Sequence, residues 1–248
     1  MLQAIHIFLH GRERPVKDVP RPVWVILTVM LLLQIILSCF RSPVNPFVKP
    51  LPAPPDTAWI RLYSLNDAVA ASRSLMLWLQ AFDNQPGISI PFRQLDYEKV
   101  KAWLDTILQL DSRNQYPLLS AARIYTQVPD EYRQRLMLEF VFEKFHDDPG
   151  QRWPALAHAV YVAKHRLKDL PLALKYAKAL TDNVTGAGVP FWVQQMQIYV
   201  LEDMDEIESA RILIGGLLDS GAIKDEHELR FLEQRLKQLE AKAAEDGR

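Results

Sequence analysis

The run WPALAHAVYVAKHRLKDLPLALKYAKALTD, residues 153–182, carries the clearest structural signal in this chain. Its apolar residues recur every three or four positions, which is the periodicity of an amphipathic α-helix. The pattern breaks at Lys168-Asp169 and resumes at Leu170, beside a proline that the first turn of a helix tolerates. The run therefore predicts two helices, over 153–166 and 170–182, joined by a short turn.

Helical periodicity continues on both sides of this pair. A helix is predicted over 64–82 with Ser64 as its cap, and another over 95–111 with Asp96 as its N-cap, separated by an ordered loop. No stretch shows sustained strand alternation, so the sequence predicts an all-α fold. The remaining helices are predicted over 116–127, 131–146, 190–203, 206–219 and 225–244.

The predicted helices form pairs that recur along the chain. Tyr116, Trp153 and Trp192 open successive pairs at intervals of 37 and 39 residues, and both tryptophans are predicted to be buried between helices. Residues 153–157 (WPALA) resemble the W-x2-L-G opening of the tetratricopeptide repeat, with alanine in place of glycine, and 169–177 (DLPLALKYA) resemble its second helix.

This resemblance to the tetratricopeptide repeat covers about residues 95–220. The interval is longer than that family's unit of about 34 residues, and the third unit lacks the leucine and glycine of the opening. The resemblance implies a short α-solenoid in which each pair buries its apolar face against the next. Leu229, Leu232, Leu236 and Leu239 then give the last helix one apolar face, as a capping helix needs; a short coiled-coil seam is the alternative.

An uncharged apolar run, VWVILTVMLLLQIILSCF, occupies residues 23–40. A helix of this length covers about 27 Å, so the run is predicted to be a transmembrane helix that contacts lipid. Basic residues are denser before it than after it, so the positive-inside rule places residues 1–22 in the cytoplasm. The domain at 61–248 would then lie in the periplasm of a bacterium, anchored in the inner membrane. The flanking basic residues are Arg12, Arg14, Lys17 and Arg21 before the run, and Arg41 and Lys49 after it.

Two further features adjoin the run. Ile36-Leu37-Ser38-Cys39 resembles a lipobox, and in that alternative interpretation Cys39 becomes the lipidated N-terminus of a processed lipoprotein. Residues 41–60 are rich in proline, which favours an extended polyproline II segment and predicts a semi-rigid tether between membrane and domain.

Motifs for catalysis are missing from the sequence. It holds no Walker loop, dinucleotide fingerprint or H-E-x-x-H, and its single cysteine excludes a cysteine metal cluster. A net charge of -1 gives no bulk attraction to nucleic acid. The chain is accordingly predicted to be no enzyme and to need no metal or other cofactor.

The resemblance implies that first-helix positions line a groove that binds protein partners, and these positions correspond to His158, Tyr161 and Gln197. A basic cluster surrounds the following turn and would suit an acidic peptide or lipid headgroups; it consists of Lys164, Arg166, Lys168, Lys175 and Lys178, of which the first three are the candidate partner-binding residues.

Three functions follow from these features. The favoured one is a membrane-anchored scaffold or assembly factor that binds membrane or periplasmic proteins. The alternative is a bitopic accessory subunit whose transmembrane helix packs into a larger membrane complex. A hydrolase is disfavoured by the missing motifs.

Overall fold

The computed structural model describes residues 19–40, 47–184, 189–221, 223 and 225–246. The chain divides into two compact units, one ending at Phe47 and the other beginning at Val48, and each is described by itself. Several residues used in the topology argument lie outside the described residues, namely Arg12, Arg14, Lys17 and Arg41.

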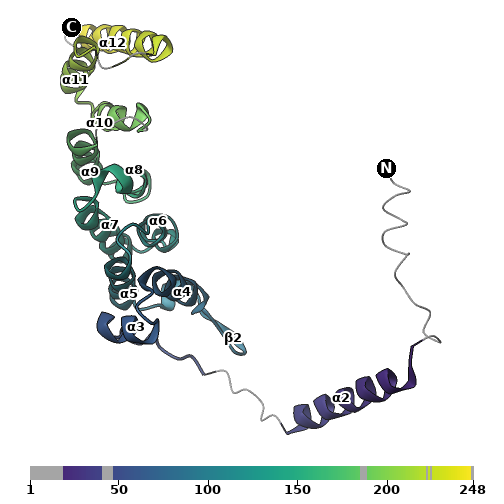
Figure 1. The fold of residues 1–248 in the computed structure, drawn as a ribbon. Coiled ribbons are helices and arrows are strands. Elements are labelled where there is room, and N and C mark those ends of the chain that lie inside the picture. Colours follow the sequence, from purple (N-terminus) through teal and green to yellow (C-terminus); the bar gives the residue numbers. More distant parts are fainter. Residues whose placement is uncertain (1–18, 41–46, 185–188, 222, 224, 247–248) are drawn as a thin grey trace, which may run out of the picture. The chain divides into compact units, whose positions relative to one another are not determined.

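The first unit contains helix α2, Arg21–Cys39, which matches the predicted apolar helix (Figure 1). None of its residues is buried, and Cys39 is exposed at its last position. Among the described residues it is the one helix long and apolar enough to cross a membrane. A helix with these properties near an N-terminus suits a membrane anchor or a signal sequence.

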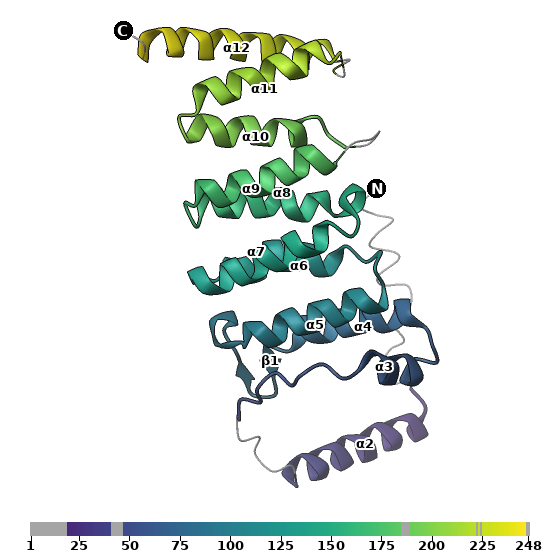
Figure 2. The ribbon, with the colours of Figure 1, turned by 90° about the vertical axis from the view of Figure 1, so that its left-hand side faces the viewer.

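The regular secondary structure described in the second unit is helical except for one hairpin, whose two strands have two residues each (Figure 2). The predicted all-α class is therefore confirmed. The predicted helices beyond residue 95 are all present, within a few residues of their expected ends. The helices are α3 (Thr57–Tyr63), α4 (Ala68–Ala81), α5 (Tyr97–Leu110), α6 (Tyr116–Arg123), α7 (Glu131–Phe145), α8 (Pro149–His165), α9 (Leu170–Asn183), α10 (Trp192–Asp203), α11 (Ile207–Asp219) and α12 (Glu226–Asp246).

Aspartate side chains fix where many of these helices begin. Each accepts a hydrogen bond from a backbone N–H of the first turn, which satisfies a donor that has no partner within the helix. Their negative charge also complements the helix dipole. Asp148 and Pro149 together start α8 earlier than the predicted residue 153. The capping residues are Asp56, Asp67, Asp96, Asp130, Asp148 and Asp169.

The region before residue 95 differs from the prediction. Ser64 follows the end of α3, a helix that was not predicted, and α4 is capped by Asp67 instead. Leu65 and Asn66 have positive φ angles of 53° and 65°, a conformation that interrupts the helical run. The predicted loop contains strands β1 (Asn84–Gln85) and β2 (Ile88–Ser89), paired antiparallel, and the 3-10 helix η2 (Phe92–Gln94).

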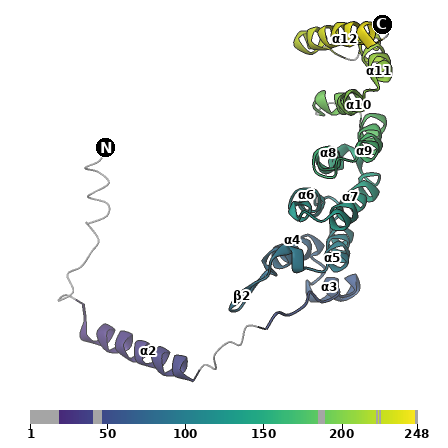
Figure 3. The ribbon, with the colours of Figure 1, turned by 180° about the vertical axis from the view of Figure 1, so that it is seen from behind.

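Successive helices pack against each other in chain order, and they form two layers (Figures 1 and 3). One layer contains α4, α6, α8, α10 and α12, and the other contains α5, α7, α9 and α11. Within a layer, α6 packs against α8 and α5 against α7. A 3-10 turn, η3 (Tyr125–Gln127), extends α6 toward α7.

The core consists of two apolar clusters, one running from α4 to α10 and a second joining α10, α11 and α12. Helices α8 and α9 meet through small, fully buried side chains that let the backbones approach closely. The predicted leucine face of α12 is used inside the chain, because Leu232 and Leu239 are buried in the second cluster. The small residues are Ala159, Ala163, Ala173 and Ala177.

The two repeat-opening tryptophans are less enclosed than predicted. Trp192 is 44% exposed, so the prediction of burial is wrong for this residue, and Trp153 is half-buried. Their rings meet edge to face with centroids 5.6 Å apart. The side chains therefore cover each other near the starts of α8 and α10, and Trp153 also packs against the main core cluster.

Residues 48–56, called the strap below, pack against the domain. Leu51 is only 3% exposed and belongs to the main core cluster. The Trp103 indole Nε1 donates to the Pro52 carbonyl at 2.8 Å, and Gln85 exchanges two hydrogen bonds of 2.9 Å with the Lys49 backbone. This part of the predicted tether is thus attached to the helices it was expected to hold at a distance.

Candidate partner-binding surface

Helices α6 and α8 lie side by side and run in the same direction. At their N-terminal ends the Gln115 and Gln151 side chains are hydrogen-bonded at 3.5 Å. At the other end Arg166 donates to the Thr126 carbonyl at 3.0 Å and to Gln127 Oε1 at 2.9 Å. The two helices therefore present one continuous surface to solvent.

Three rings form a row on the α8 part of this surface. His158, Tyr161 and His165 are three and four positions apart, which places them on one side of the helix. The Tyr161 ring centroid lies 5.6 Å from that of His158 and 4.8 Å from that of His165. Tyr161 is 48% exposed and His165 is also exposed, while His158 is half-buried. The row thus offers a polarisable ring surface to a ligand.

His158 lies between positive groups. Burial lowers the pKa of His158 below its usual value, and the guanidinium groups of Arg123 and Arg166 lower it further. Its Nε2 atom is buried without a hydrogen-bond partner among the described residues. Protonating this ring would place a third positive charge beside the two arginines, so the neutral form is favoured.

The basic residues differ in whether their charge is balanced. Lys164 forms an ion pair of 2.7 Å with Asp203. Arg166 donates to uncharged oxygens, and within the described part of the chain the exposed side chains of Arg123 and Lys168 have no carboxylate partner. The charges of Arg123, Arg166 and Lys168 therefore remain available to an acidic ligand. The name basic-aromatic face is used below for Arg123, His158, Tyr161, His165 and Arg166.

Gln197 occupies a different environment from the other two predicted groove residues. Its Oε1 accepts a hydrogen bond of 2.8 Å from Thr181 Oγ1 on α9, and it lines a cavity of about 240 Å³ with Leu213 and Leu217 of α11. Helix α10 packs mainly on α9, and its contacts with α8 join residues 39 positions apart, Trp153 with Trp192 and Lys164 with Asp203. The side chain of Gln197 is engaged with α9 and not with the basic-aromatic face.

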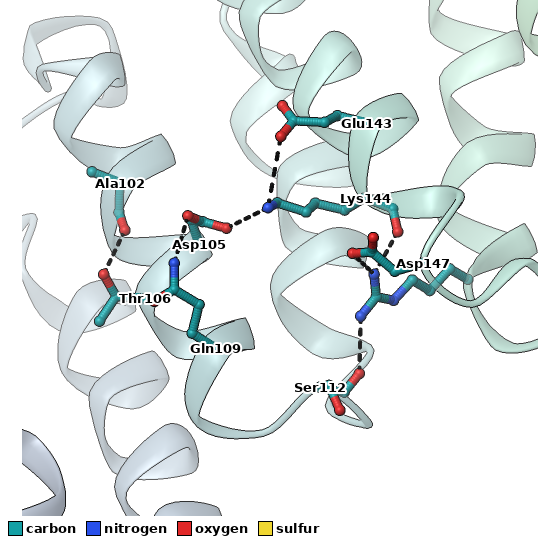
Figure 4. Close-up of polar contacts among 9 residues, drawn as sticks. Ala102, Asp105, Thr106, Gln109, Ser112, Glu143, Lys144 and Asp147 are labelled. Atoms are coloured by element: carbon teal, nitrogen blue, oxygen red, sulfur yellow. Dashed lines mark hydrogen bonds and ion pairs between the residues drawn. The ribbon is translucent and has the colours of Figure 1, made fainter. Parts of the chain in front are cut away.

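A second polar cluster joins α5, α7 and α8 beside a cavity of about 360 Å³ (Figure 4). Lys144 Nζ lies 2.8 Å from Asp105 Oδ1 and 3.7 Å from Glu143 Oε1, and the contact with Asp105 raises the pKa of Lys144. Arg152, only 6% exposed, donates to Asp147 Oδ2 at 2.8 Å and to two backbone carbonyls. Both cations of this cluster have carboxylate partners, so we interpret it as a structural connection between helix pairs.

The position of His158 predicts a pH-dependent stability. Because its folded pKa is lowered, the unfolded chain takes up this proton first as the pH falls. The free energy that the neutral His158 ring contributes to folding is fully present above the pKa of the unfolded chain, about 6.5. It is lost as the pH falls through the lower pKa of the folded protein. His158→Gln should therefore show a smaller drop in melting temperature than the wild type between about pH 7.5 and pH 5.5. An identical drop in both proteins would contradict the burial of this ring.

Metal ligation finds no support in this geometry: across the described ranges, no group of three or more His, Cys, Asp and Glu side chains is placed to hold an ion. No family model, curated protein or solved structure matches the chain.

Proposed function

We propose that this chain is a membrane-anchored scaffold or assembly factor that binds a protein partner on the basic-aromatic face. The observation that carries the proposal is the joint placement of an exposed ring row and two guanidinium groups without carboxylate partners on parallel helices. Aromatic residues and arginine are the side chains most often found at the energetic centre of protein interfaces.

The helices supporting this face resemble a tetratricopeptide array, and the spacing of contacts supports that proposal. Side-chain contacts join helices that are next but one in the chain. The Tyr132 hydroxyl bonds to Glu98, 34 residues earlier, and Lys175 to Glu139, 36 residues earlier. Ala173 and Ala210, at equivalent positions of second helices, are both fully buried. Contacts limited to near neighbours are typical of solenoids, where each unit buries its apolar face against the next.

The chemistry of the face favours an acidic segment of a protein as the ligand. A guanidinium group binds a carboxylate through two parallel hydrogen bonds, and neither Arg123 nor Arg166 has a carboxylate partner among the residues that the structure describes. The Tyr161 ring between the histidines would contact an apolar or aromatic residue of the same segment. Because the whole chain has a net charge of -1, this positive face is local, and we propose no nucleic-acid partner.

The proposed anchor is α2, crossing the bacterial inner membrane and contacting lipid along its length. Its side chains are exposed on all sides, and Trp24 lies near its N-terminal end, where interfacial aromatic residues concentrate. The positive-inside rule would place the domain in the periplasm. The role requires no catalytic chemistry, so the protein would be a binding component and not an enzyme.

Photo-crosslinking tests the proposed binding face. A photoreactive phenylalanine analogue placed at Tyr161 in the full chain should crosslink to a membrane or periplasmic protein through an acidic segment, identified by mass spectrometry. The matched control carries the analogue at Tyr132, which is 64% exposed on α7 in the opposite layer. Equal crosslinking to the same protein from both positions would contradict a specific face.

Affinity for the crosslinked partner should then depend on the same residues. Combining Arg123→Glu with Tyr161→Ala is expected to weaken binding at least about thirtyfold, because one anchor residue alone is worth on the order of 2 kcal/mol. The control variant, Tyr132→Ala with Lys178→Glu, changes exposed side chains of the other layer and should bind as the wild type does. Unchanged affinity of the first variant would refute the face.

A further inference from the structure

Helix α3 carries an apolar surface that the described residues of the domain leave largely exposed. Trp59, Leu62 and Tyr63 are 58%, 63% and 82% exposed, and their three- and four-residue spacing places them on one side of the helix. The Trp59 and Tyr63 ring centroids are 6.3 Å apart. Ile60, which is 8% exposed, lies on the side where α3 packs against α4 and α5. The apolar arc of the helix therefore continues from its buried side onto its exposed side, and Arg61 lies outside this arc.

The exposed apolar residues continue beyond the helix. Leu65, at the turn into α4, is 93% exposed. Arg61 is also exposed, and its guanidinium has no ion pair in the part of the chain that the structure describes. Trp59, Leu62, Tyr63 and Leu65 are called the α3 patch below. Exposed apolar residues gathered in this way mark a surface that contacts another apolar phase or molecule.

The composition of the α3 patch matches the membrane interface. Tryptophan and tyrosine concentrate at the level of the lipid headgroups, where their rings contact acyl chains and their polar atoms contact water. An amphipathic helix with leucine and tryptophan on one side lies in the plane of this interface. A neighbouring cation such as Arg61 adds attraction to anionic lipid.

The length of the chain keeps α3 within reach of lipid. The apolar helix α2 ends at Cys39, and the strap begins at Val48. The segment between them spans at most roughly 30 Å when fully extended. The strap is attached to Trp103 and Gln85, so it cannot extend the connection further. If α2 is embedded in a bilayer, the end of the domain that carries α3 stays close to that bilayer.

We propose that the α3 patch docks onto the headgroup region of the membrane in which α2 is anchored. This inference rests on the membrane anchor of the proposed function, but not on the identity of the protein partner. Docking adds a second contact with the membrane, and it would hold the strap-bearing end of the domain at the lipid surface.

Spin labelling of the full chain tests the docking. Single cysteines are introduced into a Cys39→Ala background and labelled with a nitroxide, and the chain is reconstituted at high dilution into vesicles of equal parts phosphatidylcholine and phosphatidylglycerol. The test position is Leu62→Cys, and the matched control is Ile212→Cys on α11, which is 66% exposed against 63% for Leu62. Leu32→Cys, within α2, reports on the anchor.

The measurement compares two collision rates of each label. One is with oxygen, which partitions into lipid, and the other is with a nickel complex, which stays in water. The labels at Leu62 and Leu32 should show severalfold higher oxygen-to-nickel ratios than the label at Ile212. Docking would be refuted if the label at Leu62 gave the same low ratio as the label at Ile212 while the label at Leu32 gave a high one. That result would leave the anchor intact. Water exposure at all three positions would overturn the anchor and docking together. If the label at Leu62 is shielded from both reagents, and only at high protein density, the patch contacts a second copy of the chain. That result would also overturn the proposal.

Discussion

Arg152→Ala is expected to lower the free energy of unfolding by about 2–4 kcal/mol, because it removes a buried side chain that packs through its stem and satisfies backbone carbonyls. The Arg152 guanidinium is 6% exposed and donates to the carbonyls of Ser112, at 3.1 Å, and of Lys144. Ser112 follows the end of α5, and Lys144 lies in the last turn of α7. The Lys144 carbonyl also accepts from the Asp147 backbone N–H at 3.3 Å, so the substitution leaves the Ser112 carbonyl as the acceptor that loses its donor.

Urea unfolding of the full chain in non-ionic detergent, followed by helical circular dichroism, measures this effect. Lys168→Ala is the matched control, because Lys168 is an exposed cation and should change stability by less than about 0.5 kcal/mol. Arg152→Lys should recover only part of the loss, since a single ammonium cannot reproduce the planar fork of donors. A loss below about 1 kcal/mol for Arg152→Ala would show that the cluster is not a structural connection.

The positions of the later helices could be predicted because local chemistry specifies them. Asp96 and Asp169 cap helices whose apolar periodicity is strong, and tertiary packing agrees with these local preferences. The same reasoning failed at Ser64, where serine and aspartate are both good caps. The choice of Asp67 depends on the turn formed by Leu65 and Asn66, and on the packing of Ile60, which the sequence pattern does not reveal.

The candidate surface could be predicted only within one helix. His158 and Tyr161 follow from the periodicity of α8, since positions on one helix share a known geometry. Arg123 comes from α6, and its approach to His158 requires knowing that the two helices lie parallel. Gln197 follows His158 by 39 positions, the interval at which Trp192 meets Trp153, but its side chain bonds to Thr181 on α9. The partner of that side chain is a tertiary property that a repeat interval does not encode.

Trp103→Ala is expected to destabilise the domain by about 3–5 kcal/mol, the usual cost of truncating a buried tryptophan. Trp103 is 4% exposed, and its ring centroid lies 4.7 Å from that of Trp78. Its indole also donates to Pro52, which joins the strap to α5. Trp103→Phe should separate the two roles, because phenylalanine retains much of the packing but cannot donate to the carbonyl.

Hydrogen exchange at the Lys49 amide reports whether the strap remains attached, since this amide donates to Gln85 Oε1. Trp103→Phe should increase its exchange while amides within α7 keep their protection, because local opening does not require global unfolding. Tyr132→Ala is the control: Tyr132 is 64% exposed on α7 and bonds to Glu98, so the Lys49 amide should stay protected. Equal protection in the Trp103→Phe variant and the wild type would mean that Leu51 alone holds the strap. Faster exchange in Trp103→Phe would instead show that the hydrogen bond from Trp103 to Pro52 helps to hold the strap against the domain.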